Sequence, residues 1–441
     1  MSSSSIPHPQ TAAERDARAV NEHAGADPGE IAIGVIIGRT SEFFDFFVYA
    51  IASVLVFPAL IFSFADPLTG TVLSFAVFAL AFVARPLGTL VFSAVDRAYG
   101  RGVKLTIALF LLGTSTVAVA FLPSYERAGW VAIAILVVFR CAQGLALAGA
   151  WDGLASLLAL NAPEGKRGWY AMMPQLGAPI GLIVASSLFA YLTMSLSAED
   201  FLSWGWRYPF FVAFAINVVA LFARLRIVVT PQYTKLFETG ELVPGTVSDT
   251  IRDDWRNIVI GAFAPLASFA LFHMVTVFPL SYVFLYTDDQ PSNFLVIEGV
   301  AAVVGLGAVV LSGVLADRIG RRWLLGASAV AIAIFSVFAP LLLAAGTVGE
   351  TVYMVLGFTL LGISFGQSSG VVAANFTRQH RYTGSALTSD LAWLFGAGFA
   401  PLVALVLTEQ LGVISSGGYL LSGAICTLIA LRLNRRLAAS N

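Results

Sequence analysis

Residues 313–322 read Gly-Val-Leu-Ala-Asp-Arg-Ile-Gly-Arg-Arg, and residues 93–102 read Ser-Ala-Val-Asp-Arg-Ala-Tyr-Gly-Arg-Gly. Both stretches form a short basic break between long apolar segments, and both combine Asp-Arg with Gly-Arg. They lie about half the chain apart, each after the second apolar segment of its half. One match of this kind arises easily by chance, but a match at both equivalent breaks indicates that the chain contains two structural repeats.

Long apolar segments recur outward from these two breaks along the whole chain. The 441 residues are 58% hydrophobic and 12% charged, whereas a soluble domain carries roughly 25% charged residues. A belt of surface that faces lipid explains the missing charge. Backbone groups in lipid must be paired internally, and the alternation of a membrane barrel is absent, so we expect helices. We predict an all-α polytopic membrane protein with about twelve spans: 32–57, 70–94, 103–122, 129–156, 169–195, 206–226, 257–286, 294–315, 323–345, 351–374, 383–408 and 413–431.

Positive charges divide the breaks into two classes. Alternate breaks and the C-terminal end are rich in arginine and lysine, whereas the other breaks are acidic and hold only Arg127 and Arg207. The positive-inside rule therefore places both termini in the cytoplasm, and we expect a multi-pass protein of the plasma (inner) membrane.

The longest charged break divides the chain near its middle. We predict a cytoplasmic central loop over 227–256, with six-helix bundles over 31–226 and 257–433. The first thirty residues lack the apolar segment of a signal peptide, so we expect a disordered cytoplasmic tail over 1–30. Residues 434–441 are predicted to form a second cytoplasmic tail.

Several classes of function find no support in the sequence. The net charge of −1 does not indicate a nucleic-acid partner. The two cysteines, Cys141 and Cys426, are far apart and form neither a disulfide framework nor a metal cluster. A phosphate-binding Gly-Lys-Ser/Thr loop is also missing. We expect no cofactor, metal, nucleotide or enzymatic activity, and we expect a monomer whose partners are the lipid bilayer, a small-molecule substrate and protons.

The break at residues 313–322 resembles the motif between helices 8 and 9 of the major facilitator superfamily. Five further stretches resemble the metabolite:proton symporter family within it: Glu42-Phe-Phe-Asp45-Phe46, Ala84-Arg85-Pro86-Leu-Gly88, Arg140-Cys-Ala-Gln143-Gly144, Pro174-Gln-Leu-Gly-Ala-Pro179 and Ser203-Trp-Gly-Trp-Arg207-Tyr-Pro209-Phe. The likeness covers nearly the whole chain after residue 30. It implies the major facilitator fold, with two pseudo-symmetric six-helix bundles, and uptake of small organic metabolites with protons. Substrates of that family include di- and tricarboxylates, shikimate-like acids, and betaine or proline.

Three positions depart from the family pattern. When the flanking residues are aligned with the family motif, Asp96 lies one residue earlier than the aspartate of that motif. A shift of one residue turns a helical side chain by about 100°. Helix 4 reads Gly149-Ala-Trp-Asp152-Gly where the family typically reads Gly-Glu-Trp-Gly-Gly, and Arg39 stands where a small or amide residue is usual. These departures indicate a divergent branch.

Charges inside a membrane span cost roughly 2.5–3.5 kcal/mol each on insertion scales, so they are paired or functional. Helix 1 carries Arg39, Glu42 and Asp45 at spacings of three, on one stripe that Tyr49 continues. Because burial disfavours the charged form of an acid, Glu42 or Asp45 is a candidate proton carrier. Arg39 and Tyr49 are candidate substrate contacts. The alternative is that Arg39 and Glu42 only neutralise each other.

Helix 4 and helix 7 supply the other central candidates. Arg140, with Gln143 one turn on, is predicted to bind an anionic substrate or to partner a helix-1 acid; a structural salt bridge is the alternative. Asp152 is a further proton-coupling candidate that alternatively faces only the inner vestibule. His273 is a candidate relay or a simple packed histidine. Tyr282 is predicted to line the cavity or to sit at the membrane interface.

The two repeated breaks are the predicted gates. Short basic loops can pair with acidic residues and helix ends and so hold one state of a transport cycle. The predicted gating residues are Asp96, Arg97, Arg101, Asp317, Arg318, Arg321, Arg322 and Asp390. A generic positive-inside role for the arginines is the alternative.

These observations predict secondary active symport of a small, carboxylate-bearing metabolite with protons, by alternating access around a midplane site. Two alternatives stay open at this point. An exporter or uniporter of an apolar compound would use Phe43, Phe44, Phe46 and Phe47 if they lined the cavity. A membrane sensor that binds a metabolite without moving it would need no working gate.

Overall fold

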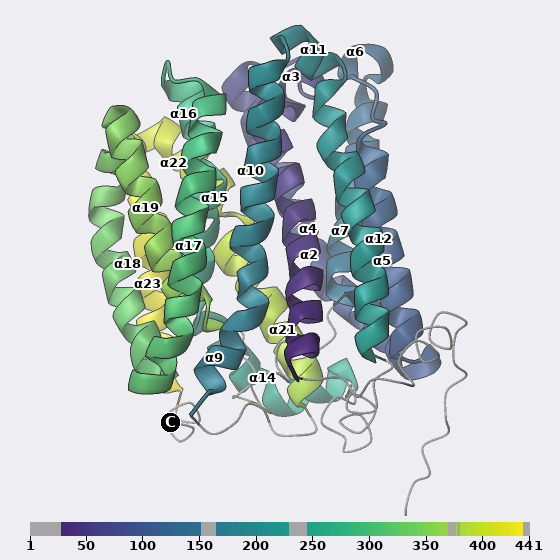
Figure 1. The fold of residues 1–441 in the computed structure, drawn as a ribbon, viewed down its shortest axis with the longest axis vertical. Coiled ribbons are helices and arrows are strands. Elements are labelled where there is room, and N and C mark those ends of the chain that lie inside the picture. The colour runs from purple at the N-terminus through teal and green to yellow at the C-terminus, as the bar shows by residue number, and fades with distance from the viewer. Residues whose placement is uncertain (1–27, 151–164, 229–244, 369–375, 377–379, 435–441) are drawn as a thin grey trace, which may run out of the picture.

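The structure, a computed structural model, describes residues 28–150, 165–228, 245–368, 376 and 380–434. Every regular element in these ranges is a helix. The long helices run along one common direction and form an elongated bundle, and short helices lie across its ends (Figure 1).

The first half of the bundle consists of long helices joined by short ones. Aliphatic residues fill the long helices, so each can bury an apolar stripe against a neighbour or face lipid. In chain order the elements are α2 (Pro28–Leu55), α3 (Phe57–Leu60), α4 (Pro67–Tyr99), α5 (Arg101–Val119), α6 (Tyr125–Ala128), α7 (Trp130–Gly149), α9 (Arg167–Met172), η1 (Met173–Leu176), α10 (Gly177–Ser195), α11 (Ala198–Ser203), η2 (Gly205–Arg207) and α12 (Tyr208–Val228).

The second half follows the same plan with more interruptions. Its elements are α14 (Val247–Phe263), α15 (Leu266–Thr276), α16 (Phe278–Tyr286), α17 (Pro291–Ile319), α18 (Arg321–Leu343), α19 (Gly346–Phe365), α21 (Arg381–Ala392), the π-helical turn η3 (Trp393–Gly398), α22 (Ala400–Leu411), η4 (Val413–Ser415) and α23 (Ser416–Leu433). In Figure 1 these green to yellow helices fill one side of the molecule, and α10 and α17 meet at the boundary with the first half.

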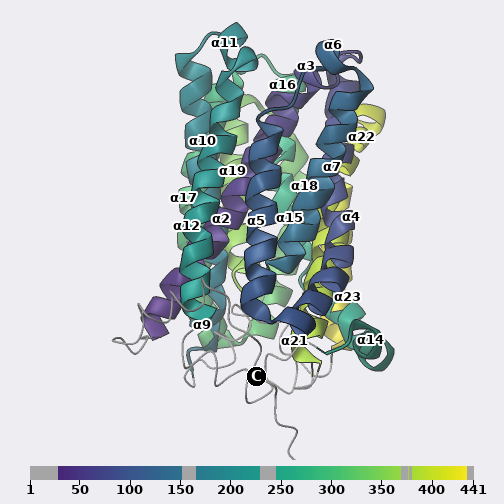
Figure 2. The same ribbon diagram turned by 90° about the vertical axis from the view of Figure 1, so that its right-hand side faces the viewer.

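Eleven helical stretches in the described residues are long and apolar enough to cross a membrane. The twelfth predicted span, α2, has 28 residues but carries Arg39, Glu42 and Asp45 near its middle. It packs against α10 and α12 along the bundle, as a spanning helix would (Figure 2). The predicted fold class of about twelve helical spans is therefore confirmed.

The region between the halves differs from the prediction. Part of the predicted loop 227–256 and the start of the predicted span 257–286 form one helix, α14, which is kinked at Asp254. The spanning part of helix 7 begins only at Leu266, after Pro265, and is interrupted again at Val277 before Pro279. Proline cannot donate a backbone hydrogen bond, so it ends or bends a helix. The predicted tails lie largely outside the described residues.

Close helix crossings hold each half together. At Gly144 on α7 an added Cβ would collide with the backbone carbonyl of Ala81 on α4. Small residues at such a crossing let two backbones approach and gain dispersion contacts that lipid cannot replace.

We expect Gly144→Ala to lower the unfolding temperature in detergent, because overpacking a tight contact costs about 1–3 kcal/mol. Gly307→Ala in α17 is the matched control, since no atom lies within 4 Å of the position of its added Cβ. Thermal unfolding of both variants checks this, and equal unfolding temperatures would contradict it.

Candidate functional site

A buried hydrogen-bonded chain joins an acid to an arginine in the middle of the first half. Thr116 Oγ1 on α5 donates to Asp45 Oδ2 on α2 at 2.8 Å. Gln143 Nε2 on α7 donates to the same hydroxyl at 2.9 Å, and Arg140 Nη1 donates to Gln143 Oε1 at 3.0 Å. All four side chains are buried. Opposite charges are thus connected through two neutral groups and do not touch.

Arg140 is held by backbone and by aromatic rings. Its Nε donates to the carbonyl of Phe78 on α4 at 3.1 Å, and its guanidinium lies 4.0 Å from the centre of the Tyr49 ring. Only 1% of Arg140 is exposed. In the described part of the chain it forms no ion pair, and Nη2 has no hydrogen-bond partner. A buried cation without an anion is costly, so the site favours an anionic ligand.

The two acids of helix 1 have different surroundings. Glu42 forms ion pairs with Arg39 and with Arg224 on α12. Asp45 forms no ion pair with any described residue, and its Oδ1 has no hydrogen-bond partner. The neutralising reading of Arg39 and Glu42 therefore fits the structure, and Asp45 is the acid that a proton can neutralise.

An aromatic cluster fills the space between the halves beside Arg140. The cluster comprises Phe43, Phe46, Phe47, Phe78, Phe82, Phe272, His273, Phe365 and Trp393, whose neighbouring ring centres are 5.0–6.5 Å apart. Three of the helix-1 phenylalanines, Phe43, Phe46 and Phe47, are buried and face this cluster rather than lipid. Phe44 is buried too, but it is not part of the cluster. The π-helical turn η3 begins at Trp393 and so sets the position of its ring.

His273 is brought to the site as a packed ring. It stacks on Phe46 with ring centres 5.0 Å apart, and its Nδ1 lies 3.4 Å from Thr276 Oγ1. Tyr282 is not brought there. Its ring lies 5.3 Å from that of Tyr286 in the same helix, α16, and it shares no hydrogen bond with the Asp45–Arg140 chain. The cavity role of Tyr282 stays a prediction.

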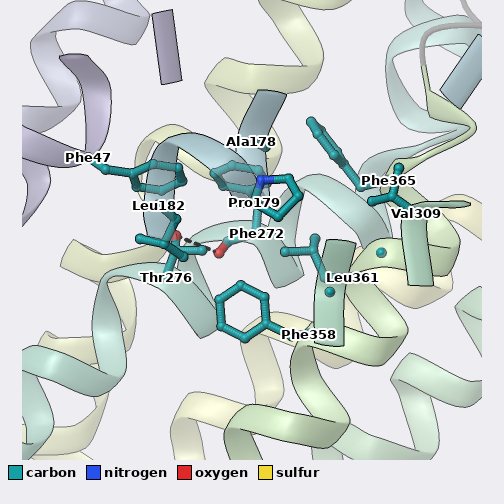
Figure 3. Close-up of a pocket in the computed structure, with 12 residues that line it drawn as sticks. Phe47, Ala178, Pro179, Leu182, Phe272, Thr276, Val309, Phe358, Leu361 and Phe365 are labelled. Atoms are coloured by element: carbon teal, nitrogen blue, oxygen red, sulfur yellow. Dashed lines mark hydrogen bonds between the residues drawn. The ribbon is translucent and has the colours of Figure 1, made fainter. Parts of the chain in front are cut away.

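A small apolar pocket adjoins the cluster at the boundary of the halves (Figure 3). Phe47, Ala178, Pro179 and Leu182 line it from the first half. The second half contributes Phe272, Thr276, Gly305, Val309, Phe358, Leu361, Gly362 and Phe365. In the described ranges no three metal-ligating side chains gather at one place.

Polar contacts join the halves at the end of the bundle that carries α9 and α14, here called the α14 end. Asp317 of α17 accepts hydrogen bonds from the backbone amides of Gly168 and Trp169, at 2.6 and 3.0 Å. A carboxylate at a helix N-terminus is stabilised by the free amides and by the helix dipole. Arg321 donates to the carbonyl of Arg167, at 3.4 Å, on the same turn.

The equivalent break of the first half makes a similar contact despite its shifted register. Asp96 is buried, with Arg101, Lys104 and the Tyr382 hydroxyl of α21 each 3.5 Å from its Oδ2. Lys104 also donates to Tyr382, at 2.6 Å. Arg97 is exposed and donates to the carbonyl of Gly245 at 3.4 Å.

A third contact between the halves, an ion pair, lies deeper in the bundle. Arg85 of α4 pairs with Asp390 of α21 at 3.1 Å, and Thr89 donates to the same carboxylate. Arg318 and Arg322 form no hydrogen bond or ion pair in the described residues, so the structure does not bring them to the gate. Asp152 lies outside the described residues.

Sequence reasoning missed several partners. Arg85 stood in a quoted motif, and a charge inside a span was a usable signal for it. Arg224 and Lys104 belong to the positive charges at the predicted breaks and were assigned no further role, but the structure buries both. Arg101, a predicted gating residue, is buried with them. Thr116 carried no signal, because an isolated threonine in an apolar helix is common.

The chain is similar in sequence and in fold to known membrane transport proteins. Residues 35–401 match the family model described as Major Facilitator Superfamily. An inner membrane metabolite transport protein of Escherichia coli, YhjE, is 36% identical over 92% of this chain and 93% of its own length. The shikimate transporter of the same organism is 27% identical over 85% and 87%. The crystal structure of a D-xylose-proton symporter has a TM-score of 0.69 at 18% identity, covering 92% of this chain and 97% of the other.

We expect Asp317→Asn to speed hydrogen exchange in α9 roughly tenfold or more, because hydrogen bonds to a charged acceptor contribute about 1.5–3 kcal/mol. Exchange followed by mass spectrometry on peptides covering 167–172 checks this. Asp289→Asn is the control, since Asp289 accepts from Thr347 at the other end of α17. Unchanged exchange in Asp317→Asn would count against the gate contact.

Proposed function

The chain belongs to the major facilitator superfamily, and we propose that it is a symporter that moves a small, carboxylate-bearing metabolite together with protons. It is a membrane transporter of metabolites and not an enzyme. The observation that carries the finer proposal is the buried chain from Asp45 through Thr116 and Gln143 to Arg140.

Asp45 is the proposed proton carrier. A carboxylate in a dry bundle is stable when it is protonated or paired with a cation. Among the residues that the structure describes, Asp45 has a hydroxyl donor but no ion pair, whereas Glu42 has two arginines. Proton release from Asp45 therefore changes the charge of the site, while Glu42, paired with Arg39 and Arg224, fixes helix 1 against α12.

Arg140 is the proposed substrate contact. Its Nη2 has no hydrogen-bond partner in the described residues, and a substrate carboxylate can accept from it. Substrate and proton are then coupled through one hydrogen-bonded chain. An anion bound to Arg140 changes the electrostatic potential at the Asp45 carboxyl group and so changes how readily that group binds a proton. The similarity to a shikimate transporter supports a carboxylate substrate. The similarity in fold to a D-xylose-proton symporter is consistent with proton coupling.

Alternating access would separate the halves at the α14 end. Asp317, Asp96 and the Arg85–Asp390 pair each link an element of the first half to one of the second. We place this end, with both termini, in the cytoplasm, and we take 31–226 and 257–433 as the two moving units.

The apolar pocket supports a second candidate, an exporter or uniporter of an apolar compound on the same fold. Phe47, Phe272, Phe358 and Phe365 line that pocket without a charged side chain. Such a substrate would not need Arg140.

The test uses purified protein in liposomes that enclose a pH-sensitive dye. Organic acids, amino acids, betaines and uncharged aromatics are added singly, against protein-free liposomes. Symport predicts internal acidification that depends on a carboxylate substrate and exceeds leakage of the free acid. Transport of an uncharged aromatic without acidification would favour the second candidate.

We expect Asp45→Asn to abolish accumulation driven by a pH gradient while keeping exchange of substrate across the membrane, because the amide can still accept from Thr116. Glu42→Gln should instead destabilise the protein, since breaking a buried ion pair costs about 3–5 kcal/mol. Glu409→Gln, at a contact with Tyr286, is the control. Proton-driven accumulation in Asp45→Asn would refute the assignment.

We expect Arg140→Gln to raise the KM for a carboxylate substrate roughly tenfold to hundredfold, because it removes a charge-assisted hydrogen bond. Arg140→Lys should recover part of the affinity, as lysine keeps the charge but not the planar fork. Concentration-dependent uptake measures both, with Arg432→Lys as an exposed control. An unchanged KM would favour the apolar substrate.

A further inference from the structure

The helix α14 lies at one end of the bundle, outside the stretches that can span the membrane. Its inner face is apolar, and Val247 and Ile258 pack on Phe376 and on Leu387 of α21. Figure 2 shows α14 at the lower edge of the bundle, below α23. The chain then turns at Pro265 and enters the span that begins at Leu266. A helix so close to the start of a span must lie near the bilayer surface.

A second apolar stripe on α14 is exposed. Ile251 precedes the kink at Asp254, and Trp255 and Val259 follow it at a spacing of four; the three residues are 47%, 55% and 41% exposed. Exposing three large apolar side chains to water is unfavourable by roughly 25 cal/mol for each Å². A helix in the plane of the interface buries such a stripe among the outer acyl groups, and tryptophan is enriched at that depth.

Two arginines border this stripe. Arg252 and Arg256 are exposed, and neither forms an ion pair in the described residues. The guanidinium of Arg256 lies 5.8 Å from the centre of the Trp255 ring. Both are therefore available at the level where a tryptophan sits beside lipid headgroups.

The acidic residues of α14 have partners on the protein. Asp254 lies 2.9 Å from His380 Nδ1, and Asp253 lies 4.0 Å from Nε2 of the same ring. Asp249 accepts from Thr246. Asp254 and Asp249 are thus engaged near α21 and at the start of α14, whereas the Asp253 side chain stays 59% exposed beside His380. Arg252 and Arg256 are the positive charges beside the exposed apolar residues.

We propose that α14 is an interfacial anchor that binds anionic phospholipid headgroups through Arg252 and Arg256. Ile251, Trp255 and Val259 enter the outer acyl layer beside them. Because α14 packs on α21, which carries Asp390 and Tyr382, lipid binding holds an element of the α14-end contacts in place. This anchor does not depend on the substrate or on proton coupling.

The test places a fluorescent label in the full-length protein. Trp255→Cys is labelled with the dye NBD in a Cys141→Ser, Cys426→Ser background and reconstituted in phosphatidylcholine vesicles. Either brominated phosphatidylcholine or brominated phosphatidylglycerol is added at equal fraction as the quencher. Asp253→Cys is the matched label on the neighbouring position, and aqueous iodide reports exposure to water.

We expect brominated lipid to quench the label at 255, iodide to quench mainly the label at 253, and phosphatidylglycerol to be the stronger lipid quencher. Arg252→Gln and Arg256→Gln should each reduce that preference by up to roughly fivefold. Arg318→Gln, an exposed arginine of α17 at the same end, should not. Strong iodide quenching at 255 would overturn the anchor, and lipid quenching without a preference for phosphatidylglycerol would overturn the headgroup site.

Discussion

The absence of water from the bilayer core controls which charges this bundle can hold. A charge there must find a counter-ion, a hydrogen bond or a proton. Glu42 has two arginines and Asp390 has Arg85, so these acids are satisfied inside the protein. Asp45 and Arg140 are separated by Thr116 and Gln143. That separation leaves Asp45 open to a proton and Arg140 open to an anion, and the proposed coupling follows from it.

The contacts between the halves differ in kind along the bundle. Carboxylates, arginines and backbone amides meet at the α14 end, whereas aromatic rings and an apolar pocket meet further in. Hydrogen bonds at a wet end are easily exchanged for water, because their net contribution is only about 0.5–1.5 kcal/mol, or about 1.5–3 kcal/mol with a charged partner. Aromatic rings can slide past one another without leaving polar groups unpaired. This division suits a protein whose halves must separate at one end.

The contacts between the halves and the proposed lipid anchor share one element. The helix α21 carries Tyr382 and Asp390 on its inner side and supports α14 on another. A shift of α14 relative to the bilayer would therefore move α21 and change the positions of the residues that join the halves. In such an arrangement the membrane itself is a ligand of the closed end, because it binds one position of the helix better than another.

The sequence by itself determined most of the spans, the duplicated breaks and the stripe of charges on helix 1, because apolar length, loop charge and helical spacing are local properties. It started the seventh span too early, since the first residues of that span belong to α14. It also singled out Arg140 and Asp317. Only the tertiary structure decided which charges are paired. Glu42 finds Arg224, Asp390 finds Arg85, and Asp96 reaches Tyr382 across large separations in the chain. The local periodicity of the sequence does not reveal such partners, because the rotation and packing of the helices determine which side chains meet. For the same reason the sequence did not predict α14 as a helix with two apolar faces.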